Sequence, residues 1–321
     1  MWQTLLQILL LVVGMALLIK GADFFVDGAS AVARAMKISP LIIGLTLVSI
    51  GTSLPELSVS LTAAVTGKND MGLGNVVGSN IFNTFVVIGA SALFTTMVVS
   101  KSMKKYDIPV LLGIYALLAT FAFALTPGVI SRVESIVIFA LMFAYIAFLI
   151  IRSKRGEEET PAEDDEKQRK WYWNLLFILL GGAAIIGGGT LTVNAAEHIA
   201  LKLGMSELLV GLTVVAVGTS LPELVTSMVA AKKGENDIAV GNAIGSSIFN
   251  VVLILGLTGI ISPIKVATSS WVDVAVMALS AVMVWLFALK SSKVGKWQGV
   301  SLILVYAAYL TYIILRNMAI L

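Results

Sequence analysis

The hexapeptide Gly-Thr-Ser-Leu-Pro-Glu occurs twice in the chain, and each copy places one glutamate, Glu56 or Glu223, inside an apolar run. The two copies belong to a longer repeat, 44–89 and 211–256, in which about 25 of 46 aligned positions are identical. Shared exposure to lipid would preserve only apolarity, whereas this repeat also preserves Thr, Ser, Pro and Glu. The repeat therefore indicates a duplicated functional unit.

Each hexapeptide predicts a helix break beside a carboxylate. A proline lacks the amide donor and clashes with the carbonyl four residues earlier, so Pro55 and Pro222 are expected to break their helices. The break would free backbone oxygens near Gly51 and Gly218. Hydroxyl oxygens lie alongside, on Thr52, Ser53, Thr219 and Ser220.

The donor atoms of this unit are all oxygens, and neither hexapeptide contains a Lys, Arg or His that could neutralise its glutamate. A set of carboxylate, hydroxyl, amide and carbonyl oxygens suits hard cations, Ca²⁺ in particular. Zn²⁺ or Cu²⁺ would favour His or Cys, and the chain has one His and no Cys. Two carboxylates can balance one Ca²⁺ or a small number of Na⁺. Competition between Ca²⁺ and Na⁺ for this site would make the protein an antiporter.

Further polar residues follow in the second part of each copy. Ser79 and Asn83, like Ser246 and Asn250, are four residues apart and share one helix face, where they could present oxygens to a cation. Asn75 and Asn242 could be ligands or could serve packing or capping. For the glycines we expect a close helix contact instead, at Gly74, Gly78, Gly241 and Gly245.

The composition requires elements that cross a membrane. With 58% hydrophobic and 13% charged residues, the chain cannot be a soluble domain, and its apolar runs of about 20 residues are long enough to span a bilayer as helices. We predict an all-α membrane protein with ten spans. They are 3–36, 39–66, 71–97, 107–126, 131–151, 172–202, 205–232, 238–262, 270–290 and 297–316.

Basic residues set the predicted orientation. About sixteen Lys and Arg fall on one side of these spans and five on the other, with Lys20 left inside the first span, where we expect it to form a self-paired or water-facing cluster with Asp23 and Asp27. The basic side is expected to be cytoplasmic and both termini extracellular, in the cell membrane. A cytoplasmic polar linker, 152–170, divides a first half, 1–151, from a second, 171–321.

Five spans per half require the second half to enter the membrane from the opposite side. We therefore predict inverted-topology repeats, with broken helices and a shared site near the bilayer midplane. Three alternatives remain. The glutamates could be a protonated pair that bonds helices together, the protein could be a channel, or Ser53 or Ser220 could be the nucleophile of an intramembrane hydrolase, although no Lys or His in the motif would activate it.

The two copies resemble the alpha-repeats of the Ca²⁺/cation antiporter superfamily, and the sodium/calcium exchanger branch of prokaryotic type fits best. The resemblance rests on Gly-Thr-Ser-Leu-Pro-Glu-Leu followed by Gly-Asn-x-x-Gly-Ser-x-Ile-Phe-Asn in both halves, and it covers essentially the whole chain. It implies alternating access, electrogenic exchange of about three Na⁺ for one Ca²⁺, and no enzymatic activity. Ca²⁺ and Na⁺ would be transported substrates, without an organic cofactor or a nucleic-acid partner, and the protein is expected to function as a monomer in the lipid bilayer.

The resemblance also implies a role for each matching residue. A Ca²⁺ site would be surrounded by Glu56, Glu223, Thr52 and Thr219, and Ser49 and Ala216 would offer backbone oxygens. Sodium sites would involve Ser53, Ser220, Ser79, Ser246, Asn83 and Asn250.

Two departures from related branches bear on the coupling ion. Some relatives, notably potassium-dependent exchangers, have an acidic residue at the position of Asn250, and this chain has Asn in both halves. Proton/calcium exchangers usually read Gly-Asn-Ala-x-Glu in place of the hexapeptide. The sequence thus favours Na⁺, with proton-coupled or potassium-dependent calcium exchange as the alternatives.

Overall fold

The structure is a computed structural model that describes residues 2–67, 70–155, 171–205 and 216–317. The described chain is almost wholly helical, with several π-helical turns (η) and four two-residue strands. In order, the elements are α1 Trp2–Met36, α2 Pro40–Ile43, η1 Gly44–Val48, α3 Ser49–Thr52, α4 Leu54–Val65, α5 Asp70–Phe82, η2 Asn83–Val87, α6 Ile88–Phe94, β1 Met97–Val98, η3 Met103–Asp107, α7 Ile108–Thr120, η4 Phe121–Leu125, β2 Val129–Ile130, α8 Arg132–Lys154, α9 Trp171–Lys202, α11 Ala216–Gly218, α12 Leu221–Lys232, α13 Asn236–Phe249, η6 Asn250–Leu255, α14 Gly256–Ile261, β3 Ile264–Lys265, α15 Ser270–Ser291, β4 Lys293–Val294 and α16 Lys296–Asn317.

Among these residues, eight helices are long and apolar enough to cross a membrane, or nine if the bent pair Pro40–Thr52 and Leu54–Val65 is one span. The predicted seventh span, 205–232, includes residues 206–215, which lie outside the described part of the chain. Most of the predicted linker, 156–170, also lies outside it, and its first residues continue α8 as far as Lys154. The all-helical membrane class is confirmed, and the count of ten spans stays a prediction.

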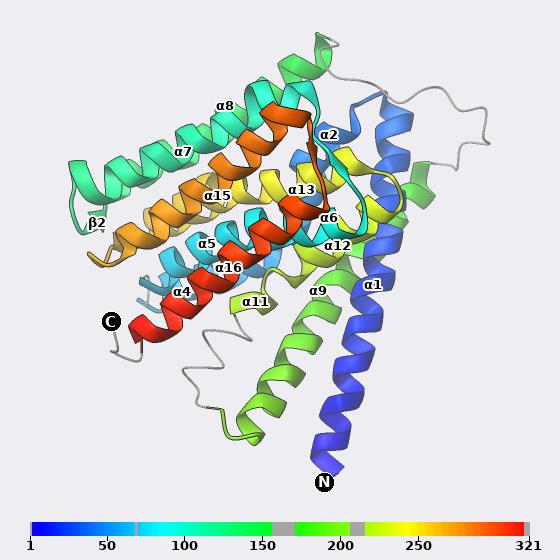
Figure 1. The fold of residues 1–321 in the computed structure, drawn as a ribbon, viewed down its shortest axis with the longest axis horizontal. Helices are drawn as coiled ribbons and strands as arrows, with labels where there is room; N and C mark the ends of the chain where they lie inside the picture. Colours follow the sequence, from blue (N-terminus) through cyan, green and yellow to red (C-terminus); the bar gives the residue numbers. More distant parts are fainter. Residues whose placement is uncertain (1, 68–69, 156–170, 206–215, 318–321) are drawn as a thin grey trace.

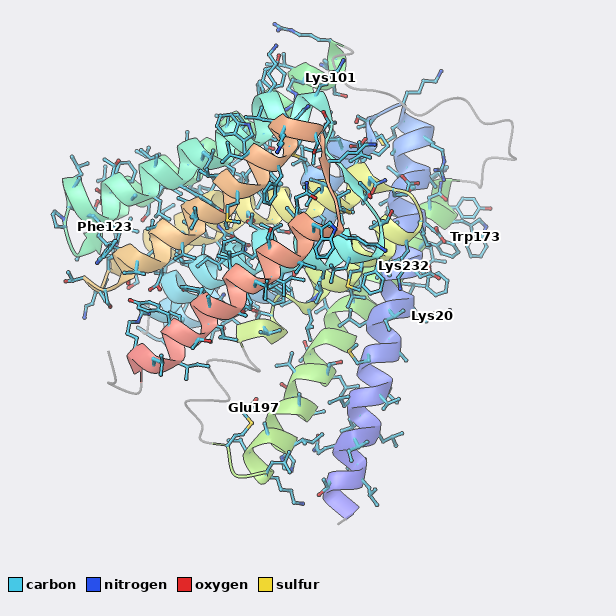
Figure 2. All side chains as sticks on the ribbon, in the orientation of Figure 1. Lys20, Lys101, Phe123, Trp173, Glu197 and Lys232 are labelled. Atoms are coloured by element: carbon cyan, nitrogen blue, oxygen red, sulfur yellow. The ribbon has the colours of Figure 1, made fainter. Side chains whose placement is uncertain are left out.

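Two of the spans form the centre of the molecule. In Gly72–Phe94 and Asn236–Ile261, 78% of the most apolar stretch is buried, against 11–39% in the other six. These central spans contain the second part of each sequence repeat. The outer helices expose large apolar side chains such as Leu9, Val133 and Leu304, as expected of surfaces that face lipid. Figure 2 shows Trp173 at the beginning of α9 and Phe123 near the opposite end of the molecule, both on its periphery.

The helices α1 and α9 run side by side at a steep angle to the other long helices, with the first part of α1 and the last part of α9 projecting away from them (Figure 1). Glycines allow the two backbones to touch. A Cβ added at Gly21 would lie 2.9 Å from the Gly181 carbonyl oxygen, and one added at Gly188 would lie 2.7 Å from that of Gly14. Small residues at a membrane helix contact permit this close approach, so the pair can pack as one unit.

Ion pairs join α1 to the segment after α12. Lys233 Nζ lies 2.7 Å from a carboxylate oxygen of both Asp23 and Asp27, and Arg34 lies 3.6 Å from Glu235. The expected cluster of Lys20, Asp23 and Asp27 is not self-paired, because the partner of both aspartates comes from the second half of the chain, but both aspartates are partly exposed, as the water-facing alternative requires. Lys20 lies midway along α1 (Figure 2).

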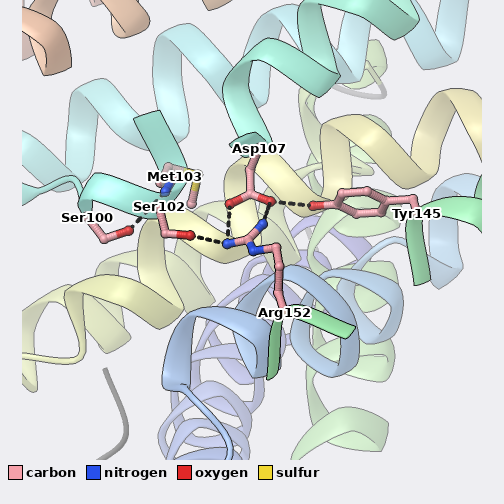
Figure 3. A network of polar contacts seen from close by, with 6 residues as sticks. All are labelled: Ser100, Ser102, Met103, Asp107, Tyr145 and Arg152. Atoms are coloured by element: carbon pink, nitrogen blue, oxygen red, sulfur yellow. Dashed lines mark hydrogen bonds and ion pairs between the residues drawn. The ribbon is translucent and has the colours of Figure 1, made fainter. Parts of the chain in front are cut away.

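A buried polar network joins η3 to α8 (Figure 3). Arg152 Nη1 lies 2.7 Å from Asp107 Oδ1, and the same oxygen accepts a hydrogen bond from the Tyr145 hydroxyl at 3.1 Å. Arg152 also donates to the Ser102 hydroxyl. Both charged side chains are buried, at 2% and 0% exposure. Arg152, which the sequence analysis placed in the linker, is therefore part of the folded interior.

Short antiparallel ladders connect loops that are distant in sequence. Strand β1 pairs with β4, and β2 pairs with β3. The two ladders link connections in the first half to connections in the second. The sequence analysis did not predict them, because two-residue strands have no periodicity to detect.

The Asp107–Arg152 pair generates a prediction about stability. Arg152→Leu leaves the Asp107 carboxylate buried without its charged partner, which should lower the free energy of unfolding by about 3–5 kcal/mol. The measurement is the midpoint of thermal unfolding in detergent. Lys154→Leu, an exposed basic residue on the same helix, is the control and should leave the midpoint unchanged. Equal midpoints for wild type and Arg152→Leu would contradict the stabilising role of the pair.

Candidate functional site: two buried glutamates at helix breaks

Both predicted helix breaks are present. In the first copy, α3 ends at Thr52, α4 begins at Leu54, and the two segments are bent by 49°. In the second copy, α11 ends at Gly218 and α12 begins at Leu221. The prolines lie in the first turn of α4 and α12, where a missing amide costs least. Both breaks therefore lie inside the hexapeptide, just before the proline, as the sequence predicts.

The breaks place Glu56 and Glu223 in the first turn of a 12-residue helix, and both side chains are completely buried. A helix N-terminus favours an anion, by about 0.3–1 kcal/mol at an exposed position. That contribution is small against the cost of burying an ionised carboxylate. Each glutamate therefore needs further compensation.

Reciprocal hydrogen bonds connect the two copies. The Ser53 hydroxyl donates to Glu223 Oε1 at 2.9 Å, and the Ser220 hydroxyl donates to Glu56 Oε1 at 3.1 Å. Each serine thus belongs to one break and serves the glutamate of the other. The structure brings residues about 170 positions apart into one buried cluster.

The second oxygen of each carboxylate is free. Glu56 Oε2 and Glu223 Oε2 are buried and accept no hydrogen bond. Neither glutamate forms an ion pair with any Lys, Arg or His of the described chain. Buried polar atoms normally have partners, so these two unpartnered carboxylate oxygens are candidate cation ligands.

Thr52 ties the first break to α13. Its hydroxyl donates to Asn242 Oδ1 at 3.0 Å and lies 3.5 Å from the Ser246 hydroxyl. Ser246 also donates to the Ser49 backbone carbonyl at 3.3 Å. The predicted backbone oxygen of Ser49 and the hydroxyls of Thr52 and Ser246 therefore lie together.

The asparagines left open by the sequence have matching contacts in the two copies. Asn75 Nδ2 donates to the Glu56 backbone carbonyl and to the Ser60 hydroxyl, at 3.4 and 3.0 Å. Asn242 Nδ2 makes the equivalent bonds to Glu223 and Ser227, at 3.3 and 2.9 Å. These asparagines hold the backbone of the glutamates in place. Ser60 and Ser227 were missed, although both copies have serine at this position.

The remaining predicted residues of the central helices are buried with free polar atoms. These atoms are Ser79 Oγ, both amide atoms of Asn83, and Asn250 Oδ1. Asn83 begins η2 and Asn250 begins η6, so each lies where the helix widens into a π-helical turn, a feature often found at functional sites.

Two predicted residues of the second break are less defined. Thr219 Oγ1 is buried without a hydrogen-bond partner. Ala216 begins α11, and its part in ion binding stays a prediction. Hydrogen bonds therefore connect seven of the predicted residues at the two breaks: Glu56, Glu223, Ser53, Ser220, Thr52, Ser49 and Ser246. The part of Ser79, Asn83, Asn250 and Thr219 in ion binding stays a prediction.

The repeat glycines serve packing in the second copy. A Cβ at Gly241 would lie 3.0 Å from the Leu41 carbonyl oxygen, and one at Gly245 would lie 2.7 Å from that of Leu45. The close helix contact expected there is confirmed. For Gly74 and Gly78, no atom of the described residues lies within 4 Å of an added Cβ, so the close contact expected there stays a prediction.

This arrangement can bind a hard cation. It offers carboxylate, hydroxyl, amide and carbonyl oxygens, and within the described ranges no group of three or more His, Cys, Asp or Glu side chains forms a different metal-binding cluster. The serines are bonded to carboxylates, not to a histidine or lysine, so the geometry gives no support to a hydrolase.

Comparison with known proteins agrees with this chemistry. The sequence pattern of the sodium/calcium exchanger protein family matches residues 6–151 and 173–315. The sodium/calcium exchanger MaX1 of Methanosarcina acetivorans is 35% identical over 339 residues, covering 94% of this chain and 97% of the relative. The inner membrane protein YrbG of Escherichia coli is 36% identical over 310 residues, covering 93% and 94%.

A solved structure gives the same result for the fold. The sodium-calcium exchanger NCX_Mj, soaked with 2.5 mM Na⁺ and 0.1 mM Ca²⁺, superposes with a TM-score of 0.82 at 30% sequence identity. The match covers 95% of this chain and 98% of the solved one.

The free carboxylate oxygens generate a prediction about cation binding. Glu56→Gln or Glu223→Gln should each weaken Ca²⁺ binding at least 100-fold, about 2.7 kcal/mol, because each removes half of the negative charge that balances the ion. Binding of radioactive Ca²⁺ to purified protein in detergent measures the effect. Glu197→Gln makes the same change near the far end of α9 (Figure 2) and should bind as wild type does. Unchanged binding in either glutamate variant would contradict the assignment.

Proposed function

The chain belongs to the sodium/calcium exchanger family, and on that premise we propose that it exchanges about three Na⁺ for one Ca²⁺ across the cell membrane. The observation that carries this proposal is the pair of buried glutamates with free Oε2 atoms and no basic partner among the described residues. Two negative charges balance one Ca²⁺, and the same oxygens can bind Na⁺ after Ca²⁺ leaves. Membership of the family makes the protein an antiporter. Its transported ions and the ratio of Na⁺ to Ca²⁺ are what we propose.

Alternating access would move the α1–α9 pair past the other helices. Support comes from the close backbone contact of α1 and α9 at their glycines and from the way the ends of the pair project from the remaining helices (Figure 1). The Lys233 contacts with Asp23 and Asp27 would open and close with this movement. The two halves would be inverted repeats of five spans each, with the glutamates near the bilayer midplane.

The proposed orientation has both termini outside and the linker in the cytoplasm, following the excess of Lys and Arg on one side. We further propose that the monomer is the functional unit. A tenfold Na⁺ gradient supplies about 1.4 kcal/mol per ion, and a net charge adds about 2.3 kcal/mol per 100 mV. Three Na⁺ could therefore drive one Ca²⁺ out against a steep gradient.

The coupling ion is tested in liposomes. Protein is reconstituted into liposomes loaded with Na⁺, and uptake of radioactive Ca²⁺ is measured on dilution into Na⁺-free buffer. Uptake should require the outward Na⁺ gradient and fall to background in Glu56→Gln, while Glu197→Gln should retain it. A parallel sample has a pH gradient and no Na⁺. Uptake driven only by the pH gradient would show a proton-coupled exchanger, and absence of flux in both samples would overturn the proposal.

The charge ratio is tested with a set membrane potential. At three Na⁺ for one Ca²⁺, each cycle of Ca²⁺ uptake removes one net positive charge from the liposome. A potential that is positive inside, set with K⁺ and valinomycin, should therefore accelerate Ca²⁺ uptake several-fold, and a potential that is negative inside should slow it. Uptake that does not respond to the potential would indicate a neutral exchange of two Na⁺ for one Ca²⁺.

A further inference from the structure

A side chain that the sequence analysis did not assign, Asn80, lies in α5 one residue from Ser79 and is completely buried. The two copies differ at this position, since the equivalent residue of the second copy is Ser247. Buried amides normally have hydrogen-bond partners. The partners of Asn80 indicate what it does.

Asn80 contacts three other elements. Its Nδ2 donates to the Ser247 backbone carbonyl at 3.0 Å and lies 3.8 Å from Met277 Sδ. Its Oδ1 accepts a hydrogen bond from Asn250 Nδ2 at 3.0 Å. Asn80 thus links α13 and α15 to the first residue of η6.

This chain of hydrogen bonds has one permitted direction. The Ser247 carbonyl can only accept, so the amide nitrogen of Asn80 must face it. The Asn80 oxygen then faces Asn250, and Asn250 must present its own nitrogen to Asn80. As a result, Asn250 Oδ1 points away from Asn80, and it is buried without a hydrogen-bond partner.

The reciprocal contact, from Ser247 of the second copy to Asn83 of the first, is not formed. Ser247, at the position equivalent to Asn80, donates its hydroxyl to the Ala243 carbonyl of its own helix. Asn83, the equivalent of Asn250, has both amide atoms free. One asparagine of the pair is therefore oriented by a neighbour and the other is not.

We propose that Asn80 is a positioning residue that fixes the amide of Asn250 with its oxygen free to bind a transported Na⁺. This role rests on the proposed exchange of Na⁺ for Ca²⁺. Asn80 does not touch the ion itself. It removes the alternative amide orientation, in which Asn250 would turn NH₂ hydrogens toward a cation.

The same contact with Asn80 disfavours a negatively charged side chain at residue 250. An ionised carboxylate there would place an acceptor against the acceptor Oδ1 of Asn80, whose other orientation is blocked by the Ser247 carbonyl. Asn80 therefore favours a neutral donor at residue 250. The negative charge of the cluster is then that of Glu56 and Glu223 alone.

A double-mutant cycle tests the positioning role. Asn80→Leu keeps the shape of the side chain and removes both hydrogen bonds. We expect it to raise the Na⁺ concentration for half-maximal exchange about tenfold, with the maximal rate changed less than threefold. Asn250→Ala should raise the same concentration, and adding Asn80→Leu to it should raise it by less than twofold more, because Asn80 acts only through Asn250.

Ser247→Ala is the matched control, since it removes the hydroxyl and keeps the backbone carbonyl that orients Asn80. It should show the wild-type Na⁺ dependence. If Asn80→Leu does not fold, Asn80→Ser introduces the residue of the second copy and should give the same rise. Thermal unfolding of each variant in detergent checks that it is folded.

The outcomes separate the two proposals. If wild type exchanges Na⁺ for Ca²⁺ but Asn80→Leu leaves the Na⁺ dependence unchanged, or if the two substitutions act additively, the positioning role is overturned and the proposed function stands. If wild type shows no Na⁺-dependent Ca²⁺ flux, both are overturned.

Discussion

Burial of two carboxyl groups in one cluster is the constraint on which the structure depends. Glu56 and Glu223 are fully buried, and each accepts one hydrogen bond from a serine of the opposite break. Neither glutamate has a basic partner in the described chain, and the described residues leave the Oε2 atom of each carboxylate without a hydrogen bond. A bound cation would supply the missing partner of these oxygens, and its release would leave them unpartnered again. The energy of the cluster therefore depends on whether an ion is bound, as a carrier requires.

Two kinds of contact surround this cluster. The central helices α5 and α13 hold the glutamate backbones through Asn75 and Asn242. The charged pair of Asp107 and Arg152 secures α8 to η3. By contrast, α1 and α9 pack closely on each other through glycine, and α1 meets Lys233, which follows α12, through exposed ion pairs that cost little to break.

Local signals in the sequence predicted the local features of the site. Proline located both helix breaks, and the repeat identified the glutamates, hydroxyls and paired asparagines. Contacts between distant segments could not be predicted in this way. From sequence, Arg152 is assigned to the linker because its partner Asp107 is 45 positions away. Asp23 and Asp27 are grouped with the nearby Lys20, whereas their partner in the structure is Lys233. Asn80 is a position at which the copies differ, and only its hydrogen bond with Asn250 shows its role.

The central claim is that one cation binds between the free oxygens of the two glutamates. The most direct measurement is anomalous diffraction from crystals of the protein soaked with Sr²⁺, a heavier substitute for Ca²⁺. If a cation binds there, the anomalous peak lies in contact with both Glu56 Oε2 and Glu223 Oε2, at a distance slightly above the roughly 2.3–2.6 Å typical of Ca²⁺. A peak that contacts neither carboxylate, with both glutamates still bonded as described, would contradict it.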